Sequence, residues 1–512
     1  MKFSLKLYLL FFFLFTAAHA QEVFVFDADT KLPLVAVLIQ NKDQSSTTLT
    51  DLMGKASLKD FDRSSTLEIS HPSYISYKIT KIQWIQRGGL VYLQRNAFEL
   101  DEVVMSISKW EQQKKEVPQK IIGVSAQSIA FTQPQTAADL LQQSGKVYVQ
   151  KSQLGGGSPM IRGFAANRIL LSVDGVRMNN AIFRGGNLQN AIAVDPFSIK
   201  NTEVIFGSGS VIYGSDALGG VIHYYTKTPQ FSTTGQSEVS GNVQYRYSTA
   251  NDEKTTHADL SFSGKKWGFL SSVSSNNFGD LQMGKYGLED YLRPQFAAVI
   301  NGEDQLIFNT DQRLQTPTAY QQIHLMQKLL HRSSDQSLFS LGIHFSETSD
   351  YARYDRLTRP SKDGQGLRSA VWNYGPQKWF MTNFQWTHSP DNLFYEGLKL
   401  TAAYQKFGES RYDRDFGEID LYRTEELVDA LSINLDIEQF KKGALRLFYG
   451  AEFVANKVGS SATVEQPSLG MSAPYASRYP DNSSWATAAA YLNGSLETGN
   501  ALSFLGGLRY SH

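Results

Sequence analysis

The 512-residue chain has no cysteine, no net charge and only one long run of hydrophobic residues. Without cysteine it has no disulfide, no thiolate metal site and no cysteine nucleophile. Its 49 basic and 49 acidic residues balance, which does not favour nucleic-acid binding, because that function calls for a basic surface. A mean hydropathy of −0.31 excludes a bundle of membrane-spanning helices. A transmembrane β-barrel remains open, because its alternating strands average to the hydropathy of a soluble protein.

The apolar run lies at the N-terminus and predicts export. Two lysines precede apolar residues 7–16, and the small residues Ala18 and Ala20 follow. This is the pattern of a secretory signal peptide, whose apolar region is shorter than the roughly 20 residues that a membrane-spanning helix needs. We therefore expect residues 1–20 to be a signal peptide that is cleaved after Ala20.

The next two segments differ in their content of β-prone residues. Residues 21–95 contain about six short apolar runs separated by turn residues, which predicts a small β-sandwich. Residues 96–117 are polar and lack periodicity, which is typical of a linker. A β-prone island interrupts this linker and consists of Asp101, Glu102, Val103, Val104, Met105 and Ser106. The island fits two roles equally well, a peptide that adds as a strand to a partner and a last edge strand of the sandwich.

Residues 118–230 mix helical and extended patterns. Residues 136–143 are expected to form a short helix between Pro134 and Gly145. Short strands are expected near 146–149, 160–161, 169–173 and 202–205. The glycines of this segment do not form a nucleotide-binding loop, because Gly219 is followed by Gly220 rather than by lysine. Tight turns and close backbone approach explain these glycines better.

Residues 231–512 alternate apolar and polar side chains in successive runs, the period of strands with one apolar face. We count about eleven such strands, near 237–247, 255–264, 267–277, 319–331, 335–347, 377–388, 395–407, 427–440, 444–456, 485–496 and 501–512. Short connections alternate with long ones at 278–318, 348–376, 408–426 and 457–484. Outer-membrane barrels have this arrangement of short periplasmic turns and long extracellular loops, so the segment is predicted to be an antiparallel transmembrane barrel.

Several motifs carry a resemblance to known families. The run Ser158-Pro-Met-Ile-Arg162-Gly163 through Asp174-Gly175 to Asn180, and the run from Asp195 to Ile222, resemble the plug of TonB-dependent outer-membrane receptors. Residues 21–95 resemble a carboxypeptidase-regulatory-like domain, and the island after them then resembles a TonB box, which favours its strand-adding role. The family closes its barrel with 22 strands, and this chain supplies about half. We therefore expect the sequence to be a fragment or a truncated form of a longer receptor.

The resemblance also implies roles for individual plug residues. Arg162 and Glu203 would form ion pairs within the plug or against the barrel and act as a latch; a solvated surface charge is the alternative. Structural turns are expected at Gly163, Asp174, Gly175, Gly207, Gly214, Gly219 and Gly220. A polar loop after a plug strand is the candidate solute contact, through Asn179, Asn180, Phe183, Arg184 and Asn187. A plain loop would explain these five residues equally well.

The expected fold class is mainly β, with an N-terminal β-sandwich, an α/β plug and an antiparallel barrel in the outer membrane of a Gram-negative bacterium. By resemblance, the function is energised import of a scarce iron source, haem or a ferric siderophore. Cobalamin import, a passive porin and a surface adhesin are the competing interpretations. The expected partners are the TonB protein of the inner-membrane energising complex, outer-membrane lipid, the solute and a surface lipoprotein. No nucleic acid, enzyme activity, metal site or cofactor is expected. If the solute is haem, its axial ligand would be histidine or tyrosine; histidines on or beside the expected strands are His257, His324, His331, His344 and His388.

Overall fold

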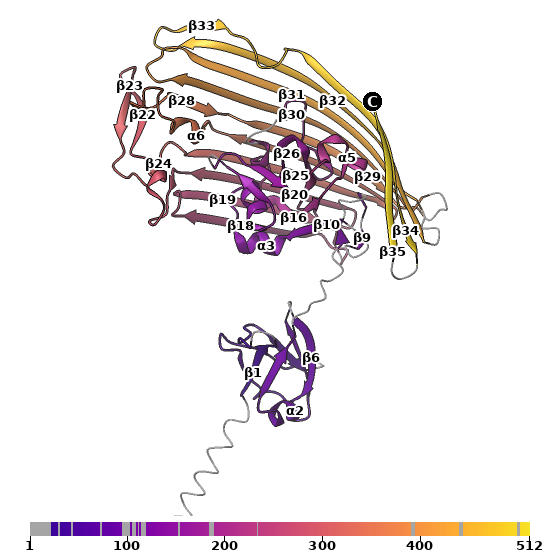
Figure 1. Ribbon diagram of the computed structural model, residues 1–512. Coiled ribbons are helices and arrows are strands. Elements are labelled where there is room, and N and C mark those ends of the chain that lie inside the picture. Colours follow the sequence, from indigo (N-terminus) through magenta and orange to yellow (C-terminus); the bar gives the residue numbers. More distant parts are fainter. Residues whose placement is uncertain are drawn as a thin grey trace, which may run out of the picture. The chain divides into compact units, whose positions relative to one another are not determined.

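The computed structural model divides the chain into two compact units, Met1–Glu102 and Val103–His512 (Figure 1). The described residues are 22–28, 31–41, 45–71, 74–94, 103–104, 109–110, 112–113, 119–151, 154–183, 189–232, 234–390, 395–439, 444–498 and 502–512. The predicted signal peptide lies outside them, as do Asp101, Glu102, Met105, Ser106, Arg184 and Asn187.

The first unit packs two small sheets around one apolar core. The strand orders are β4-β1-β7 and β3-β2-β5-β6. Val23 and Val25 of the first sheet meet Ile39, Leu67 and Ile69 of the second, and all five are fully buried. The elements are β1 (Glu22–Asp27), β2 (Leu38–Asn41), β3 (Thr47–Leu49), β4 (Lys55–Ser57), β5 (Thr66–His71), β6 (Tyr74–Thr80), α2 (Lys81–Gln86) and β7 (Leu90–Leu93). Two packed sheets agree with the expected sandwich; its assignment to the carboxypeptidase-regulatory-like domains stays a prediction.

Two details of this unit differ from the sequence-based expectation. The apolar run of residues 35–39 predicts a strand from residue 35, but β2 begins at Leu38, because Ala36 adopts a left-handed backbone conformation with φ 57°. The helix α2 was not anticipated. It begins at a capping box, in which the Thr80 side chain accepts from the Gln83 backbone and the Gln83 side chain accepts in return. Six residues are too few to show a helical period, so only the cap signalled this helix.

The predicted plug forms the first part of the second unit. Its main sheet has the order β10-β16-β17-β14-β15, and only β14 and β17 pair in parallel. Thr136 caps α4, which confirms the helix expected over 136–143. No helix among the described residues is long and apolar enough to cross a membrane. The elements are β10 (Lys120–Ser125), α3 (Ala126–Thr132), α4 (Ala137–Gln143), β11 (Tyr148–Gln150), β12 (Ser158–Ile161), β13 (Phe164–Ala165), β14 (Ile169–Val173), β15 (Val176–Arg177), β16 (Ile199–Phe206), α5 (Ser210–Tyr213) and β17 (Gly220–Thr226).

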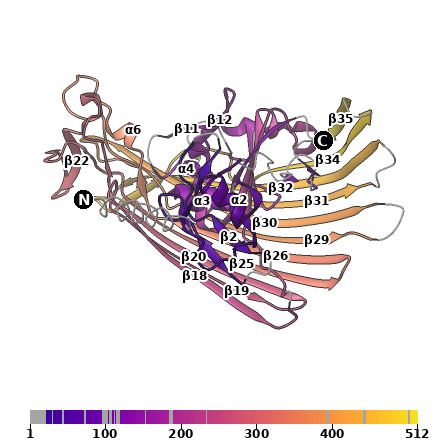
Figure 2. The same ribbon diagram turned by 90° about the horizontal axis from the view of Figure 1, so that it is seen from below.

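The rest of the second unit is one curved antiparallel sheet, which we call the wall. Its eleven main strands follow chain order, and among the described strands the sheet is open, with β18 and β35 at its edges. Figure 2 shows α3, α4, β11 and β12 of the plug over the concave side of this sheet. The strands are β18 (Glu238–Ser248), β19 (Glu253–Ser263), β20 (Trp267–Phe278), β25 (Tyr320–Ser334), β26 (Ser337–Thr348), β29 (Lys378–His388), β30 (Gly397–Asp415), β31 (Leu421–Glu438), β32 (Leu445–Gln466), β34 (Ser483–Thr498) and β35 (Leu502–Ser511).

The wall has its apolar face outside and its polar face against the plug. Along β25, Gln322 and His324 are buried on the concave face, whereas Ile323 and Leu325 are 39% and 40% exposed on the other. A soluble protein buries its apolar face, so this reversal is the arrangement of a barrel whose outer surface contacts lipid. The alternation read from the sequence therefore predicted both the strands and their orientation.

The two ends of the wall differ in the length of their connections. Short turns join β25 to β26 and β31 to β32 at one end, which we call the short-turn end. The other, long-loop end carries the hairpin of β22 (Gln295–Ile300) and β23 (Glu303–Phe308), which extends beyond the sheet in Figure 1. The long loop expected at 408–426 is wrong. Strands β30 and β31 continue pairing to Asp413 and Tyr422, because backbone hydrogen bonds persist where polar side chains hide the alternation.

Candidate functional site

The contact between the plug and the wall contains a buried charge centre at Asp174. This residue turns the chain between β14 and β15, with φ 49°, and its carboxylate accepts hydrogen bonds from the Thr226 backbone and hydroxyl at 2.9 and 2.7 Å. From the wall, Lys328 Nζ lies 2.9 Å and His344 Nε2 lies 3.4 Å from the same carboxylate. Burial opposes the charged form, but Lys328 and His344 outweigh it and hold the pKa of Asp174 well below its usual range.

A second charge centre surrounds Arg177, three residues along the chain. The Arg177 guanidinium contacts Asp216 of the plug at 2.9 Å and Glu452 of the wall at 3.2 Å. Arg509 of β35 lies 3.0 Å from the same Glu452 carboxylate and donates to the Ile212 carbonyl at 2.8 Å. The Glu452 side chain is 6% exposed and is therefore shared by two guanidinium groups inside the contact. One wall carboxylate thus joins β15 of the plug to the last strand of the wall.

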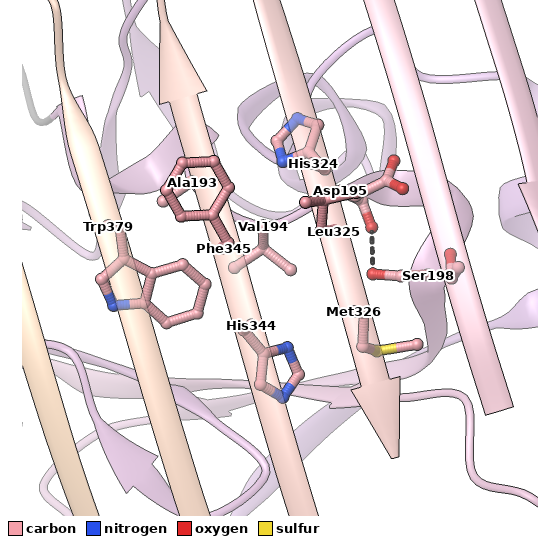
Figure 3. A pocket seen from close by; sticks show the side chains of 11 residues that line it. Ala193, Val194, Asp195, Ser198, His324, Leu325, Met326, His344, Phe345 and Trp379 are labelled. Atoms are coloured by element: carbon pink, nitrogen blue, oxygen red, sulfur yellow. Dashed lines mark hydrogen bonds between the residues drawn. The ribbon is translucent and has the colours of Figure 1, made fainter. Parts of the chain in front are cut away.

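The strap of residues 193–198 crosses the wall beside three histidines. Ser274 of β20 donates to the Asp195 carboxylate at 2.6 Å, and His257 contacts Ser274 at 2.7 Å. Figure 3 shows His324 and His344 projecting toward this strap from neighbouring strands. The space that they line with Trp379 is about 10 Å³, enough for one water molecule. This part of the contact is closed, and no solute fits in it.

The five histidines considered as haem ligands all contact other residues of the protein in this structure. His257, His324 and His344 are 0%, 5% and 4% exposed within the contact between plug and wall. Near the short-turn end, His331 stacks on Trp267 with ring centroids 3.9 Å apart, and His388 contacts the Ser337 hydroxyl at 2.9 Å. All five lie on strands of the wall, and none is in the long connections between those strands.

The chain enters the plug through an anchor formed by Lys109 and Trp110. Lys109 Nζ binds the Asp436 carboxylate of β31 at 2.8 Å, and the Lys109 carbonyl accepts from Lys399 Nζ at 3.1 Å. Trp110 is 9% exposed and lies against Gly397, where a Cβ would come within 2.6 Å of the indole ring. This glycine therefore makes room for the tryptophan. The sequence showed no signal for the anchor, because its partners lie roughly 300 positions away along the chain.

A charged pocket lies at the long-loop end. Its volume is about 340 Å³, and arginines line it together with carboxylates and Trp372. The lining arginines are Arg356, Arg359 and Arg368, and the Arg356 guanidinium stands 6.0 Å from the Trp372 ring. Sequence reasoning missed this pocket. The signal available was the arginine pair Arg356 and Arg359, three positions apart, in a loop with many other polar residues.

Comparison with known proteins identifies the domain that the wall surrounds. The family model "TonB-dependent Receptor Plug Domain" matches residues 113–221. This segment is therefore similar to the plug of TonB-dependent receptors. The matched segment is the α/β part described above, which lies over the concave side of the wall (Figure 2).

Curated relatives of this chain are named as a transporter and a receptor. The "Vitamin B12 transporter BtuB" of Vibrio vulnificus (strain CMCP6) is 40% identical over 136 residues, 26% of this chain and 22% of that protein. A "Hemin receptor" of Yersinia pestis is 32% identical over 127 residues, 25% of this chain and 18% of that protein. The chain thus matches about a fifth of the length of these curated relatives.

Solved structures share the fold at low sequence identity. "Copper transporter OprC" superposes with a TM-score of 0.59 at 12% identity, covering 76% of this chain and 55% of that one. The hemophore receptor HasR of Serratia marcescens, in complex with its hemophore HasA and heme, gives a TM-score of 0.57 at 15% identity, covering 77% and 52%. The chain spans about half the length of these receptors.

The plug turns lie where the motif residues predict them. Gly163, Gly175, Gly207 and Gly214 all have positive φ, a backbone conformation that side chains disfavour. Gly219 and Gly220 instead let neighbouring groups pack closely against the backbone. A Cβ on Gly219 would lie 2.2 Å from Phe164, and a Cβ on Gly220 would lie 2.7 Å from the Ile205 carbonyl.

The two predicted latch charges have different surroundings. Arg162 is exposed and stands 5.8 Å from the Phe206 ring, whereas Glu203 is 2% exposed in the middle of β16. Among the described residues, the ion pairs between plug and wall include Asp174 with Lys328 and Arg177 with Glu452. A latch through Arg162 and Glu203 stays a prediction, and these other charges are the ones that sequence reasoning missed.

The predicted solute loop is partly structural. Asn179 is 6% exposed, donates to the Ile169 carbonyl and accepts from the Leu171 backbone, so in this structure it holds the plug sheet and offers almost no surface to a solute. Asn180 accepts from the Ile182 backbone within a turn, and Phe183 packs against the plug core. Arg184 and Asn187 lie outside the described residues, so their solute contact stays a prediction.

The described part of the predicted TonB box is extended. Val103–Val104 form β8, which pairs antiparallel with β9 (Gln112–Gln113). In a two-stranded sheet, each strand keeps one edge without a partner strand. The box therefore has a geometry that strand addition can use, and it directly precedes the anchor at Lys109.

Proposed function

We propose that the chain is part of an outer-membrane receptor that imports a scarce iron source, haem or a ferric siderophore, by energised remodelling of its plug. The observation that carries the proposal is a plug held on the lumen face of the wall by buried ion pairs and hydrogen bonds. Buried ion pairs favour one arrangement strongly, yet water can replace them once the plug moves. Such a contact suits a plug that is displaced and then returns.

The segment before the plug supports coupling to TonB in the periplasm. A pull on β8 reaches the anchor at Lys109 and Trp110 within a few residues, and the anchor holds the chain to β30 and β31 of the wall. Force applied at the box is thus delivered first to the Lys109–Asp436 ion pair. The mixed-charge pocket around Trp372 at the long-loop end is the proposed first contact of the solute, together with the loop after Asn180.

Cobalamin import by the same mechanism is the second candidate. A relative named "Vitamin B12 transporter BtuB" is 40% identical to part of this chain, against 32% for the "Hemin receptor", and these values favour cobalamin import over a passive porin or a surface adhesin. The proposal includes no covalent change of the solute, since a plugged barrel with a solute pocket accounts for transport without one.

Uptake by cells that depend on this receptor tests the two candidates. The receptor strain is grown with and without an iron chelator, and uptake of labelled haem, a labelled ferric siderophore and labelled cyanocobalamin is compared with that of a strain lacking it. We expect induction by the chelator and uptake of an iron compound. Uptake of cyanocobalamin alone, without induction, would replace the iron proposal with the cobalamin one.

Two substitutions in the TonB box test the coupling. Val104→Pro removes the backbone N–H that a strand-adding partner needs, whereas Val104→Ala keeps it. The proline receptor should reach the membrane and bind solute normally but fail to import it, and the alanine receptor should import it. Normal import by the proline receptor would contradict the TonB-box assignment.

A further inference from the structure

A cavity of about 380 Å³ lies between the plug and the wall, toward the short-turn end. The plug side is formed by residues of β16 and β17, and the wall side by residues of β25, β26, β29, β30 and β31. Its lining shares no residue with the closed space under the strap or with the pocket at the long-loop end. The cavity is therefore a distinct internal space of the second unit.

His223 of β17 lines this cavity without a hydrogen-bond partner. The residue is 2% exposed, and within the described residues neither ring nitrogen has a partner. Its ring is held between Tyr213 and Tyr225, with centroids 5.1 and 5.7 Å away. A buried polar group normally finds a partner, and leaving one without costs stability. An orphaned and rigidly held imidazole at a cavity wall therefore indicates a ligand.

The charge of the lining defines the class of that ligand. Four lysines, Lys109, Lys200, Lys328 and Lys399, line the cavity against two carboxylates, Asp174 and Asp436, so its net charge is positive. Burial, together with Lys109 and Lys399, lowers the pKa of His223 to about 3. The imidazole is therefore neutral and offers one N–H donor. Glu203, the neighbour of His223 across the sheet, is not part of the lining. Cationic walls with an unused neutral donor suit an anion.

We propose that this cavity is an internal anion subsite, which takes a carboxylate or phosphate group of the imported solute between the plug and the wall. The proposal rests on the import function above. The haem propionates, the carboxylates of a ferric hydroxycarboxylate and the phosphate of cobalamin all present this chemistry. The subsite lies on the side from which the solute leaves, so it would hold the solute after release from the outer pocket.

The first experiment measures anion binding by the purified receptor. Inorganic phosphate is titrated into the wild type and the His223→Phe variant, and selenate is located in crystals by anomalous scattering. Phenylalanine keeps the stacking between the tyrosines but removes the donor. We expect selenate within hydrogen-bond distance of His223 and about a tenfold weaker affinity for phosphate in the variant. A cavity without selenate, or equal affinities, would overturn the proposal.

The second experiment tests whether the imported solute uses the subsite. Surface binding and import are measured for the solute that the wild type imports. His223→Phe should leave surface binding unchanged and slow import several-fold. Tyr224→Phe is the matched control, because it removes a buried hydroxyl from the opposite face of the same strand. Unchanged import in His223→Phe, or an equal loss in Tyr224→Phe, would overturn the subsite.

The two proposals fail in different ways. A wild-type receptor that imports none of these solutes contradicts the proposed function, whether or not it binds phosphate. A receptor that imports its solute but neither binds phosphate nor responds to His223→Phe contradicts only the subsite.

Discussion

Individual buried charges hold the plug against the wall, and most of them were invisible in the sequence. Asp174 was expected as a turn residue from the resemblance to the plug motif, and its positive φ agrees. Its ion pair with Lys328 joins residues far apart in the chain, which no local pattern indicates. Asn179 was read as a solute contact because polar loop residues often bind ligands. Its amide instead satisfies two backbone groups of the sheet.

The Asp174 centre gives a stability prediction. Asp174→Asn leaves the Lys328 ammonium, which is 6% exposed, without its partner carboxylate. Breaking a buried pair costs about 3–5 kcal/mol, and we expect that loss in urea unfolding of the plug followed by amide hydrogen exchange. Asp216→Asn is the control, since its side chain is 31% exposed and Arg177 keeps Glu452. An equal loss of unfolding free energy in both variants would show that burial of the ion pair does not determine its contribution to stability.

His223 gives a prediction on pH. Its pKa is about 3 in the folded plug and 6.5 in the unfolded chain, so between these values the unfolded state binds more protons. Plug stability should therefore fall as the pH is lowered from 6.5 toward 3, with a slope from this group of up to about 1.4 kcal/mol per pH unit. His223→Phe should remove that part of the slope. Unfolding midpoints measured across the window check this, and parallel curves for both proteins would refute it.

Strands were easier to predict than their lengths. The period of two located all eleven main wall strands, because lipid on one side and a polar lumen on the other impose strict alternation. Outside the membrane both faces of a strand contact water, so the alternation of apolar and polar residues is lost. For this reason β30, β31 and β32 extend into segments where loops were expected. The helix α4 was predictable from its cap, whereas the anchor at Lys109 and Trp110 depends on a glycine in a distant strand.

That glycine gives a prediction at the scale of an element. In Gly397→Ala the new Cβ would lie 2.6 Å from the Trp110 ring, so the tryptophan must leave its place against β30. We expect a red-shifted component in the tryptophan fluorescence and faster proteolysis near residue 110. Gly459→Ala in β32 is the matched control, because the nearest atom to its Cβ would be 3.7 Å away. Identical spectra for the two variants would mean that the anchor does not depend on Gly397.

At the scale of the molecule, the wall turns its apolar face outward and its polar face toward the plug, and this predicts where charge is tolerated. Leu325 on the outer face of β25 is 40% exposed, and Leu306 in the long-loop hairpin is 39% exposed. Leu325→Arg should destabilise the membrane-inserted receptor by about 2–4 kcal/mol, because its charge would lie in lipid. Leu306→Arg should cost little. Urea unfolding from lipid vesicles measures both, and similar values would contradict the placement of the bilayer.

The long reach of the contacts between plug and wall has a consequence for folding kinetics. Lys109 meets Asp436 across 327 positions, and Arg177 meets Glu452 across 275. Contacts of such separation form late, since the intervening chain must first be ordered. The plug is synthesised before the wall strands that it binds. It therefore cannot take its final position until β31 and β32 have formed. The order of synthesis thus leaves a period in which plug charges such as Asp174 and Arg177 lack their wall partners and are accessible to periplasmic chaperones.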